Sequence, residues 1–277
     1  KIISFSVFAY SGALVFTFSK VFDSMVIASV LKDGLSKLAI FTLAQTMTSI
    51  IQAPQRGIVA ASIAHLSQAW KDKNMRVIQT IYQRSSLNLL LFAAAIYFLI
   101  ALNYTEAIIT FNIKASYILG HTAFILLGLS VVIELGTGLN AQIIGTSNYW
   151  RFELFCGIIL LILTLPLTYI FVKKFDILGT ALATLISISI YNTIRIIFLW
   201  KKFKLQPFTK ETVYTICISL LCFGICYFLF RNMHGFAGLV LRSATFVLLY
   251  GGSVIFFNLS PDVKPVWKSL KSRIGLK

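Results

Sequence analysis

Eight long apolar runs, separated by short polar segments, follow one another along the chain. A helix that crosses a bilayer needs about 20 mostly apolar residues, and these runs approach or exceed that length. Strands of a membrane barrel would need only about 10 residues with alternating polarity, which the runs lack. The pattern therefore predicts an all-α integral membrane protein of about eight transmembrane helices, at residues 5–31, 38–70, 87–103, 121–145, 152–172, 177–200, 213–230 and 236–258.

The composition agrees with a lipid environment. The 277 residues are 58% hydrophobic and 12% charged, with a mean hydropathy of +0.85, whereas soluble domains are about a quarter charged. The formal charge of +16 is compatible with nucleic-acid binding. However, the basic residues gather in short segments between apolar runs rather than on one polar face. We therefore expect membrane lipids, and no nucleic acid, as partners.

The basic residues also predict an orientation, because lysine and arginine in short loops are retained in the cytoplasm. Alternate connections divide them 15 to 6, which places both ends of the chain inside. The pair Lys173 and Lys174 is the awkward exception. The richer set is Lys1, Lys71, Lys73, Arg76, Arg84, Arg151, Lys201, Lys202, Lys204, Lys210, Lys264, Lys268, Lys271, Arg273 and Lys277.

One basic segment, residues 71–84, has two interpretations. Met75, Ile78 and Tyr82 recur there at helical spacing among the charges. Such a pattern fits a short helix lying on the inner leaflet of the membrane. A solvated loop fits it equally well.

The second span carries a polar stripe, because residues three and four apart share one face of a helix. Pro54 is expected to bend this helix near its arginine. Amide and hydroxyl groups in such a stripe either join neighbouring helices by hydrogen bonds or line a water-filled cavity. The stripe consists of Thr42, Gln45, Ser49, Gln52 and Arg56.

The first span also has a polar face, which includes Lys20 and lies beside Asp23. These two residues either form a local ion pair near the end of the span or face the same cavity. A cavity lined by both spans accommodates all of these polar groups, including Arg56, and is the interpretation we prefer. We therefore predict that Lys20, Asp23 and the stripe bind substrate.

Glu134, Arg195 and Arg242 are further ionisable residues in later spans. Glu134 is a lone carboxylate that either pairs with a basic residue or carries a coupling proton. Arg195 ends a polar face of the sixth span that also contains Tyr191. Arg195 and Arg242 lie near span ends, so we expect their side chains to extend to the membrane surface.

No catalytic or cofactor motif accompanies these residues. The sequence has no Walker-type glycine loop, no HExxH motif and no outer loop large enough for a polymerase or ligase site. The four cysteines lie in apolar runs without metal-ligand spacing. We therefore predict a protein that is not an enzyme and that uses no metal or cofactor.

Four segments resemble the polysaccharide exporters of the multidrug/oligosaccharidyl-lipid/polysaccharide (MOP) superfamily. Their order and spacing, over roughly residues 1–204, make the similarity more specific than any one of them. The first matches the start of that family's second half, and the others match its next span, its fourth-to-fifth span junction and its sixth span. They read FSKVFDSMVIASVL, QAPQRGIVAASIAHLSQAW, GTGLNAQIIGTSNYWRFELF and FDILGTALATLISISIYNTIR.

The resemblance implies two six-helix lobes around a central cavity, of which residues 1–204 would form the second lobe. Residues 205–277 would then be a terminal helix pair with a basic cytoplasmic tail. Since Lys1 begins directly in an apolar run, we expect the first lobe to precede it. The substrates implied are polyprenyl-diphosphate-linked oligosaccharides, flipped across the bacterial plasma membrane during polysaccharide or lipopolysaccharide biosynthesis. A polysaccharide polymerase is the implied protein partner.

Two other functions compete with this interpretation. A drug or cation antiporter of the same superfamily would need an aromatic, acidic cavity, whereas the stripe is basic and rich in amides. A membrane-embedded glycan polymerase or ligase would need larger outer loops. Within the preferred interpretation, the glutamines and hydroxyls suit the sugar, and Arg56 and Lys20 suit the diphosphate.

Overall fold

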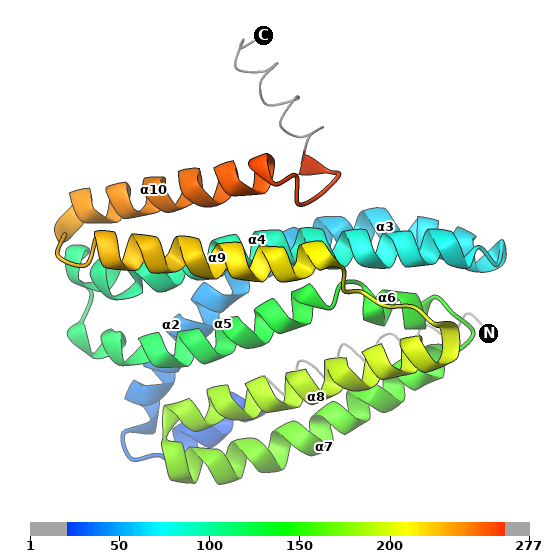
Figure 1. Cartoon of the computed structure of the whole chain (residues 1–277). Helices are drawn as coiled ribbons and strands as arrows, with labels where there is room; N and C mark the ends of the chain where they lie inside the picture. Colours follow the sequence, from blue (N-terminus) through cyan, green and yellow to red (C-terminus); the bar gives the residue numbers. More distant parts are fainter. Residues whose placement is uncertain (1–20, 264–277) are drawn as a thin grey trace.

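Helices make up all of the regular structure in residues 21–263, the part of the chain that this computed structural model describes (Figure 1). The prediction of an all-α membrane protein is confirmed, since seven of these helices are long and apolar enough to cross a membrane. The first predicted span lies partly outside the described residues. The helices are Val21–Val30, α2 Gly34–Ile51, α3 Ala53–Lys71, α4 Met75–Thr110, α5 Gly120–Gly136, α6 Asn140–Gly145, α7 Trp150–Phe175, α8 Ile177–Phe203, α9 Lys210–Leu229 and α10 Gly235–Phe256, with a 3-10 turn at Ala115–Leu119.

The second predicted span is divided into two helices that meet at Gln52. Pro54 lies in the first turn of α3, where its missing N–H leaves no hydrogen bond unmade. In a continuous helix its ring would clash with the carbonyl of residue 50. The helix therefore ends and restarts, and α2 and α3 run in different directions (Figure 1). The predicted bend near Arg56 is confirmed.

The long helix α4 corrects both interpretations of residues 71–84. This segment is the end of α3, a turn and the start of α4, and Asn74 caps α4 by accepting a hydrogen bond from the Val77 N–H at 3.2 Å. Ile78 and Tyr82 are 0% exposed, so they pack inside the protein rather than against lipid. With 36 residues, α4 is about 54 Å long and exceeds the bilayer core of ~30 Å. Its first turns therefore project beyond the membrane.

The fourth predicted span is likewise interrupted, between α5 and α6. Gly138 adopts φ +70°, and a Cβ there would lie 2.9 Å from the Ser86 backbone nitrogen on α4. The Ser86 hydroxyl donates a hydrogen bond to the Gly136 carbonyl at the end of α5. Close packing of α5 on α4 thus accompanies the end of α5 at Gly136, and Gly138 just beyond it adopts its positive φ without strain.

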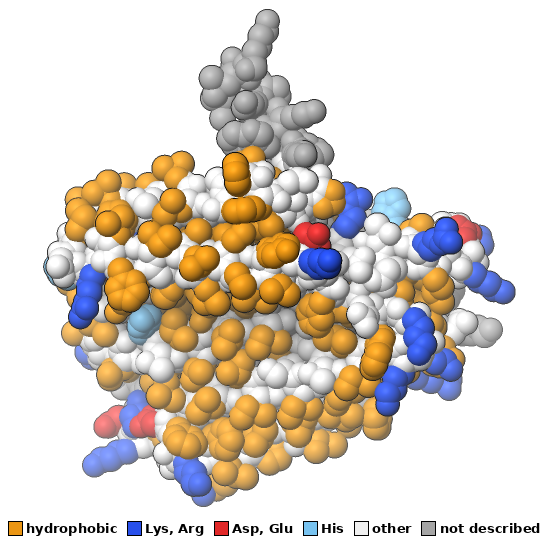
Figure 2. Space-filling model, in the orientation of Figure 1, with side chains coloured by type: hydrophobic (Ala, Val, Ile, Leu, Met, Phe, Trp, Pro, Cys, Tyr) orange, Lys and Arg blue, Asp and Glu red, His pale blue; other side chains and the backbone are white. Residues whose placement is uncertain are grey.

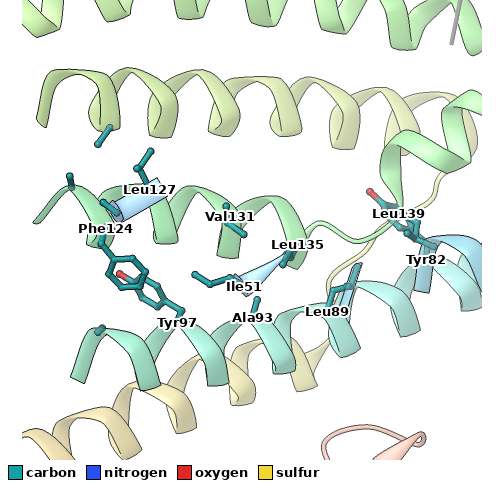
Figure 3. Packing of buried hydrophobic residues seen from close by; sticks show 14 of the residues in the cluster. Ile51, Tyr82, Leu89, Ala93, Tyr97, Phe124, Leu127, Val131, Leu135 and Leu139 are labelled. Carbon is teal, nitrogen blue, oxygen red and sulfur yellow. The ribbon is translucent and has the colours of Figure 1, made fainter. Parts of the chain in front are cut away.

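The main core lies between α2, α4 and α5. Figure 3 shows Leu89 and Ala93 of α4 beside Leu135 of α5 and Ile51 of α2, all buried. Helices α9 and α10 pack on another part of α4 through a separate cluster that includes Cys226, Phe246 and Tyr250. Whether residues 205–277 form a unit of their own stays a prediction.

Apolar side chains cover much of the outer surface. Figure 2 shows them over α7, α8, α9 and α10, with lysines and arginines gathered toward the two ends of the helices. Ile162, Leu221 and Leu248 are among the large side chains left exposed. Such a surface is costly in water and favourable in lipid, which supports a multi-pass membrane protein.

The connections at the two ends of the bundle allow a test of orientation. Two hydrogen bonds join Gln79, near the start of α4, to the backbone of Gln206. Asn74 and Gln206 therefore lie at the same end, and Asn112 at the other (Figure 1). We expect Cys at Asn74 or Gln206 to react with an impermeant thiol reagent only from the cytoplasm, and Cys at Asn112 only from outside, because of the distribution of basic residues.

The labelling scan needs a background without accessible thiols. Cys217 is exposed and the other three cysteines are buried, so Cys217→Ser is made first. Ala44, which is 0% exposed, provides a position whose Cys variant should not react. Labelling of Asn74→Cys from outside intact cells would overturn the orientation.

Candidate functional site

The stripe lies on a side of α2 and α3 that the described residues leave uncovered. Thr42, Ser49 and Arg56 are exposed, and Gln45 and Gln52 are half-buried. The opposite side of α2 is buried in the core, mainly against α5. All five residues therefore keep their side chains at least partly open to the surface, and their shared role in binding substrate stays a prediction.

The polar groups of the stripe keep free hydrogen-bonding capacity. The hydroxyls of Thr42 and Ser49 donate to carbonyls of their own helix, at 2.8 and 2.7 Å, which leaves the oxygen lone pairs able to accept. The side-chain amides of Gln45 and Gln52 make no hydrogen bond within residues 21–263, and Arg56 makes no ion pair there. This surface can therefore offer donors and acceptors, with one positive charge, to a ligand.

Asp23 does not join this surface. It is buried and accepts a hydrogen bond at 3.0 Å from the Thr168 hydroxyl on α7. Its predicted neighbour Lys20 lies outside the described residues. The substrate-binding roles of both residues stay predictions.

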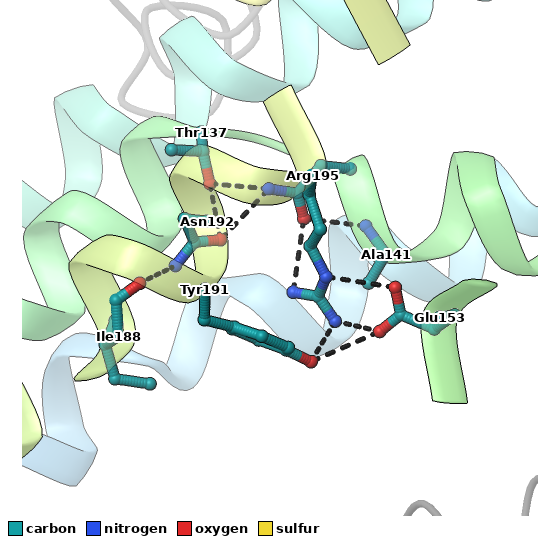
Figure 4. A network of polar contacts seen from close by, with 8 residues as sticks. Thr137, Ala141, Glu153, Ile188, Tyr191, Asn192 and Arg195 are labelled. Atoms are coloured by element: carbon teal, nitrogen blue, oxygen red, sulfur yellow. Dashed lines mark hydrogen bonds and ion pairs between the residues drawn. The ribbon is translucent and has the colours of Figure 1, made fainter. Parts of the chain in front are cut away.

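A buried polar network links α5, α6, α7 and α8 (Figure 4). At its centre Arg195, only 4% exposed, forms an ion pair with Glu153 and lies over the ring of Tyr191, 3.6 Å from its centroid. Its Nε donates to Glu153 Oε2 at 2.9 Å, and the Tyr191 hydroxyl donates to Glu153 Oε1 at 3.2 Å. The prediction that Arg195 extends to the membrane surface is therefore wrong, because its helix turns it toward an acidic partner.

Uncharged side chains extend this network toward α5. Asn140 Nδ2 donates to Thr137 Oγ1 and to Asn192 Oδ1, each at 3.0 Å. Thr137 in turn donates to Asn192 at 3.1 Å. The polar groups of these three side chains are thus hydrogen-bonded to one another at the break between α5 and α6. A buried network that is satisfied in this way favours one arrangement of the helices.

A small polar cavity of about 180 Å³ adjoins the network. Glu134 and Glu153 both line it, beside Arg195, and Gln55 reaches it from α3. Glu134 thus lies near the guanidinium of Arg195, although the ion pair of Arg195 is made with Glu153. A coupling-proton role for Glu134 stays a prediction.

The side chain of Arg242 was also predicted to extend to the membrane surface, and the structure does not show this. It is 9% exposed and donates hydrogen bonds to the carbonyls of Leu102, Phe230 and Met233 at 2.8, 3.2 and 3.0 Å. The last carbonyls of a helix lack partners within it, and Arg242 supplies one at the end of α9. It thereby fixes the α9–α10 turn to α4.

Sequence reasoning missed Glu153, Asn140 and Asn192 as members of the network. A signal for Glu153 was present, since it is an acidic residue at the start of an apolar run. Ionisable residues in spans usually have a partner, and Arg195 was available in the next span. The two asparagines carry no comparable signal, because their contacts depend on the break after α5.

Comparison with known proteins identifies the fold. No protein-family model matches the sequence, and no curated protein matches it. Among solved structures, the chain is similar to a MOP superfamily transporter from Pyrococcus furiosus and to a multidrug resistance MATE family transporter of the MOP superfamily in an outward-facing conformation. Each similarity has 15% identity and a TM-score of 0.53, and covers 92% of this chain and 64% of the other. The helices of this chain therefore adopt the fold of those transporters and span just under two thirds of their length.

Proposed function

We propose that this chain is the second lobe of a transporter that moves polyprenyl-diphosphate-linked oligosaccharide across the bacterial plasma membrane. The observation that supports it is the exposed stripe of amides, hydroxyls and one guanidinium on membrane-spanning α2 and the start of α3. A sugar and a diphosphate cannot cross hydrocarbon without hydrogen bonds and counter-charges. Gln45, Gln52 and the two hydroxyls suit the glycan, and Arg56 suits a phosphate oxygen pair.

The rest of the lobe would support alternating access, in which one lobe rocks against the other. The shared core of α2, α4 and α5, together with the Arg195 network, holds the helices in one arrangement. As the lobes rock, the part of the stripe on α2 would become accessible first from one side of the membrane and then from the other. Both ends of this chain would lie in the cytoplasm, and a polysaccharide polymerase would receive the product.

A drug or cation antiporter is the second candidate. One of the similar structures is a multidrug resistance transporter, and Asp23 is a buried carboxylate in the apolar helix Val21–Val30. Buried carboxylates within spans commonly bind cations or protons. Against this candidate, the stripe itself contains a cation and no acid.

Reconstitution of the full-length protein in vesicles separates these candidates. One assay follows a fluorescent oligosaccharide on polyprenyl diphosphate, whose glycan becomes sensitive to an external glycosidase when it is flipped. The other follows efflux of a cationic dye. We expect protein-dependent flipping without dye efflux and without any change in the mass of the glycan. Dye efflux alone would favour the antiporter, and an elongated glycan would favour a polymerase.

A further inference from the structure

The polar cavity of about 180 Å³ beside the Arg195 network is bounded by five helices. Its volume is several times the ~30 Å³ of one water in the liquid and below the ~300–1,000 Å³ of pockets that hold drug-sized molecules. The cavity therefore has room for a ligand of about one sugar ring. Its polar wall includes Gln55 of α3, Glu134 of α5, Gln142 of α6, Glu153 of α7 and Arg195 of α8.

Two side-chain amides on this wall have no partner in the described part of the chain. Gln55 and Gln142 are half-buried, and their side chains make no hydrogen bond within residues 21–263. Asn140 also lines the cavity, but its Nδ2 donates to Thr137 and Asn192. A glutamine amide offers two N–H donors and one carbonyl acceptor. Gln55 and Gln142 can therefore offer both kinds of group to a ligand.

The charged groups of the wall limit the kind of ligand. Two carboxylates, Glu134 and Glu153, and one guanidinium, Arg195, leave one formal negative charge. A carboxylate or phosphate on the ligand would be repelled at close range. A small cation would be attracted, but it would leave the N–H donors of the glutamines unused. Hydroxyl groups both donate and accept hydrogen bonds, so they suit the amides and the carboxylates together.

From these observations we propose that the cavity binds one neutral, hydroxyl-rich sugar of the glycan and rejects a sugar that carries a carboxylate. The assignment rests on the proposed function, in which Arg56 contacts the diphosphate. Gln55 directly precedes Arg56, and consecutive Cα atoms are only about 3.8 Å apart. The cavity therefore begins within reach of the sugars that follow the diphosphate.

The residues of the wall have separate tasks in this site. Gln55 and Gln142 form hydrogen bonds with the sugar hydroxyls, and Glu134 accepts one from another hydroxyl. Arg195 and Glu153 stay paired with each other, as Figure 4 shows. A site built to bind hydroxyls discriminates strongly against a ligand that leaves its polar groups unpaired. A carboxylate on the sugar adds repulsion by the excess negative charge.

The test uses full-length protein and two polyprenyl-diphosphate-linked disaccharides. Both sugars are hexoses in one compound and the corresponding hexuronic acids in the other. Binding is measured in detergent by calorimetric titration, and flipping is measured in vesicles. We expect the hexose compound to bind at least about tenfold more tightly, because like charges repel in a partly buried site. Its flipping should be faster in the same sense.

Three variants examine the wall. Glu134→Gln should reduce the preference for hexose to less than about threefold, because it removes the excess negative charge. Gln142→Ala should weaken hexose binding roughly fivefold, the usual effect of losing one neutral hydrogen bond, and Gln55→Ala should act in the same direction. The matched control is Gln68→Ala, since Gln68 is an exposed amide on α3 that bonds to Asp72 and does not line the cavity. It should bind both compounds as the unaltered protein does.

The outcomes separate this assignment from the proposed function. Equal binding of the two compounds, or unchanged hexose binding in both Gln142→Ala and Gln55→Ala, would overturn the sugar site, while continued flipping would leave the proposed function intact. The two alanine variants decide this even if Glu134→Gln does not fold. A protein that neither binds nor flips either compound would reject the proposed function and the sugar site together. Binding of a cationic dye that Glu134→Gln abolishes, without any effect of the alanine variants on hexose, would assign the cavity to an antiporter.

Discussion

Replacing Arg195 by alanine is expected to destabilise the protein by about 3–5 kcal/mol, the usual cost of breaking a buried ion pair from one side. The substitution leaves Glu153 without its cation in a largely buried place and removes the group that lies over the Tyr191 ring. It also removes a donor from the network that joins α7 to α8. We expect a lower midpoint of thermal unfolding in detergent and less protein in the membrane.

Two further variants make this prediction specific. Arg151→Ala removes an exposed arginine from the first turn of α7, whose Cζ lies 5.3 Å from the centroid of the Trp150 ring. It should cost less than about 1 kcal/mol. Arg195→Met combined with Glu153→Leu removes both charges and should recover much of the loss. If Arg195→Ala unfolded at the same temperature as Arg151→Ala, the network would have no role in stability.

Replacing Arg56 by alanine is expected to reduce oligosaccharide flipping by about tenfold to a hundredfold, the effect of losing a charge-assisted contact with a phosphate. Arg56→Lys should retain part of the activity, because the charge survives while the planar fork is lost. Membrane abundance should stay normal in both variants, since Arg56 is exposed and has no acidic partner in the described part of the chain.

The control for Arg56 is Arg76→Ala, another exposed arginine, on the projecting start of α4. It should flip substrate at the normal rate. Normal flipping by Arg56→Ala would exclude a substrate contact at this position. A fall in abundance would instead mean that Arg56 neutralises a carboxylate, although Asp23 is bonded to Thr168 and Glu134 lies beside Arg195.

The spans were predictable from sequence because each depends on local properties of the chain. Length and hydropathy identify α7, α8, α9 and α10 almost to their ends. The break at Gln52 also has a local cause, since Pro54 prevents a continuous helix. It could therefore be predicted from the sequence. Thr42, Gln45 and Ser49 lie on one helix, so their spacing alone places them on one face of α2, whereas the binding role of the stripe stays a prediction.

The remaining errors concern contacts between distant segments. The end of α5 depends on its close approach to Ser86, fifty residues earlier in the chain. The burial of Arg195 depends on how α8 is rotated against α7, which hydropathy does not determine. The Met75, Ile78 and Tyr82 spacing correctly indicated a helix, but its apolar side packs into the protein instead of lipid.

The junction at Gln52 gives the stripe two parts that differ in freedom of movement. Phe41, Ala44 and Ile51 hold α2 in the core, whereas Leu66 and Ala69 are the only fully buried side chains of α3. Tilting α3 about Gln52 would therefore disturb few packed side chains. The glutamine and hydroxyl groups on α2 would then keep their positions, while Arg56 would move with α3. Arg56 could in this way stay in contact with one end of a long, flexible substrate as that end moves.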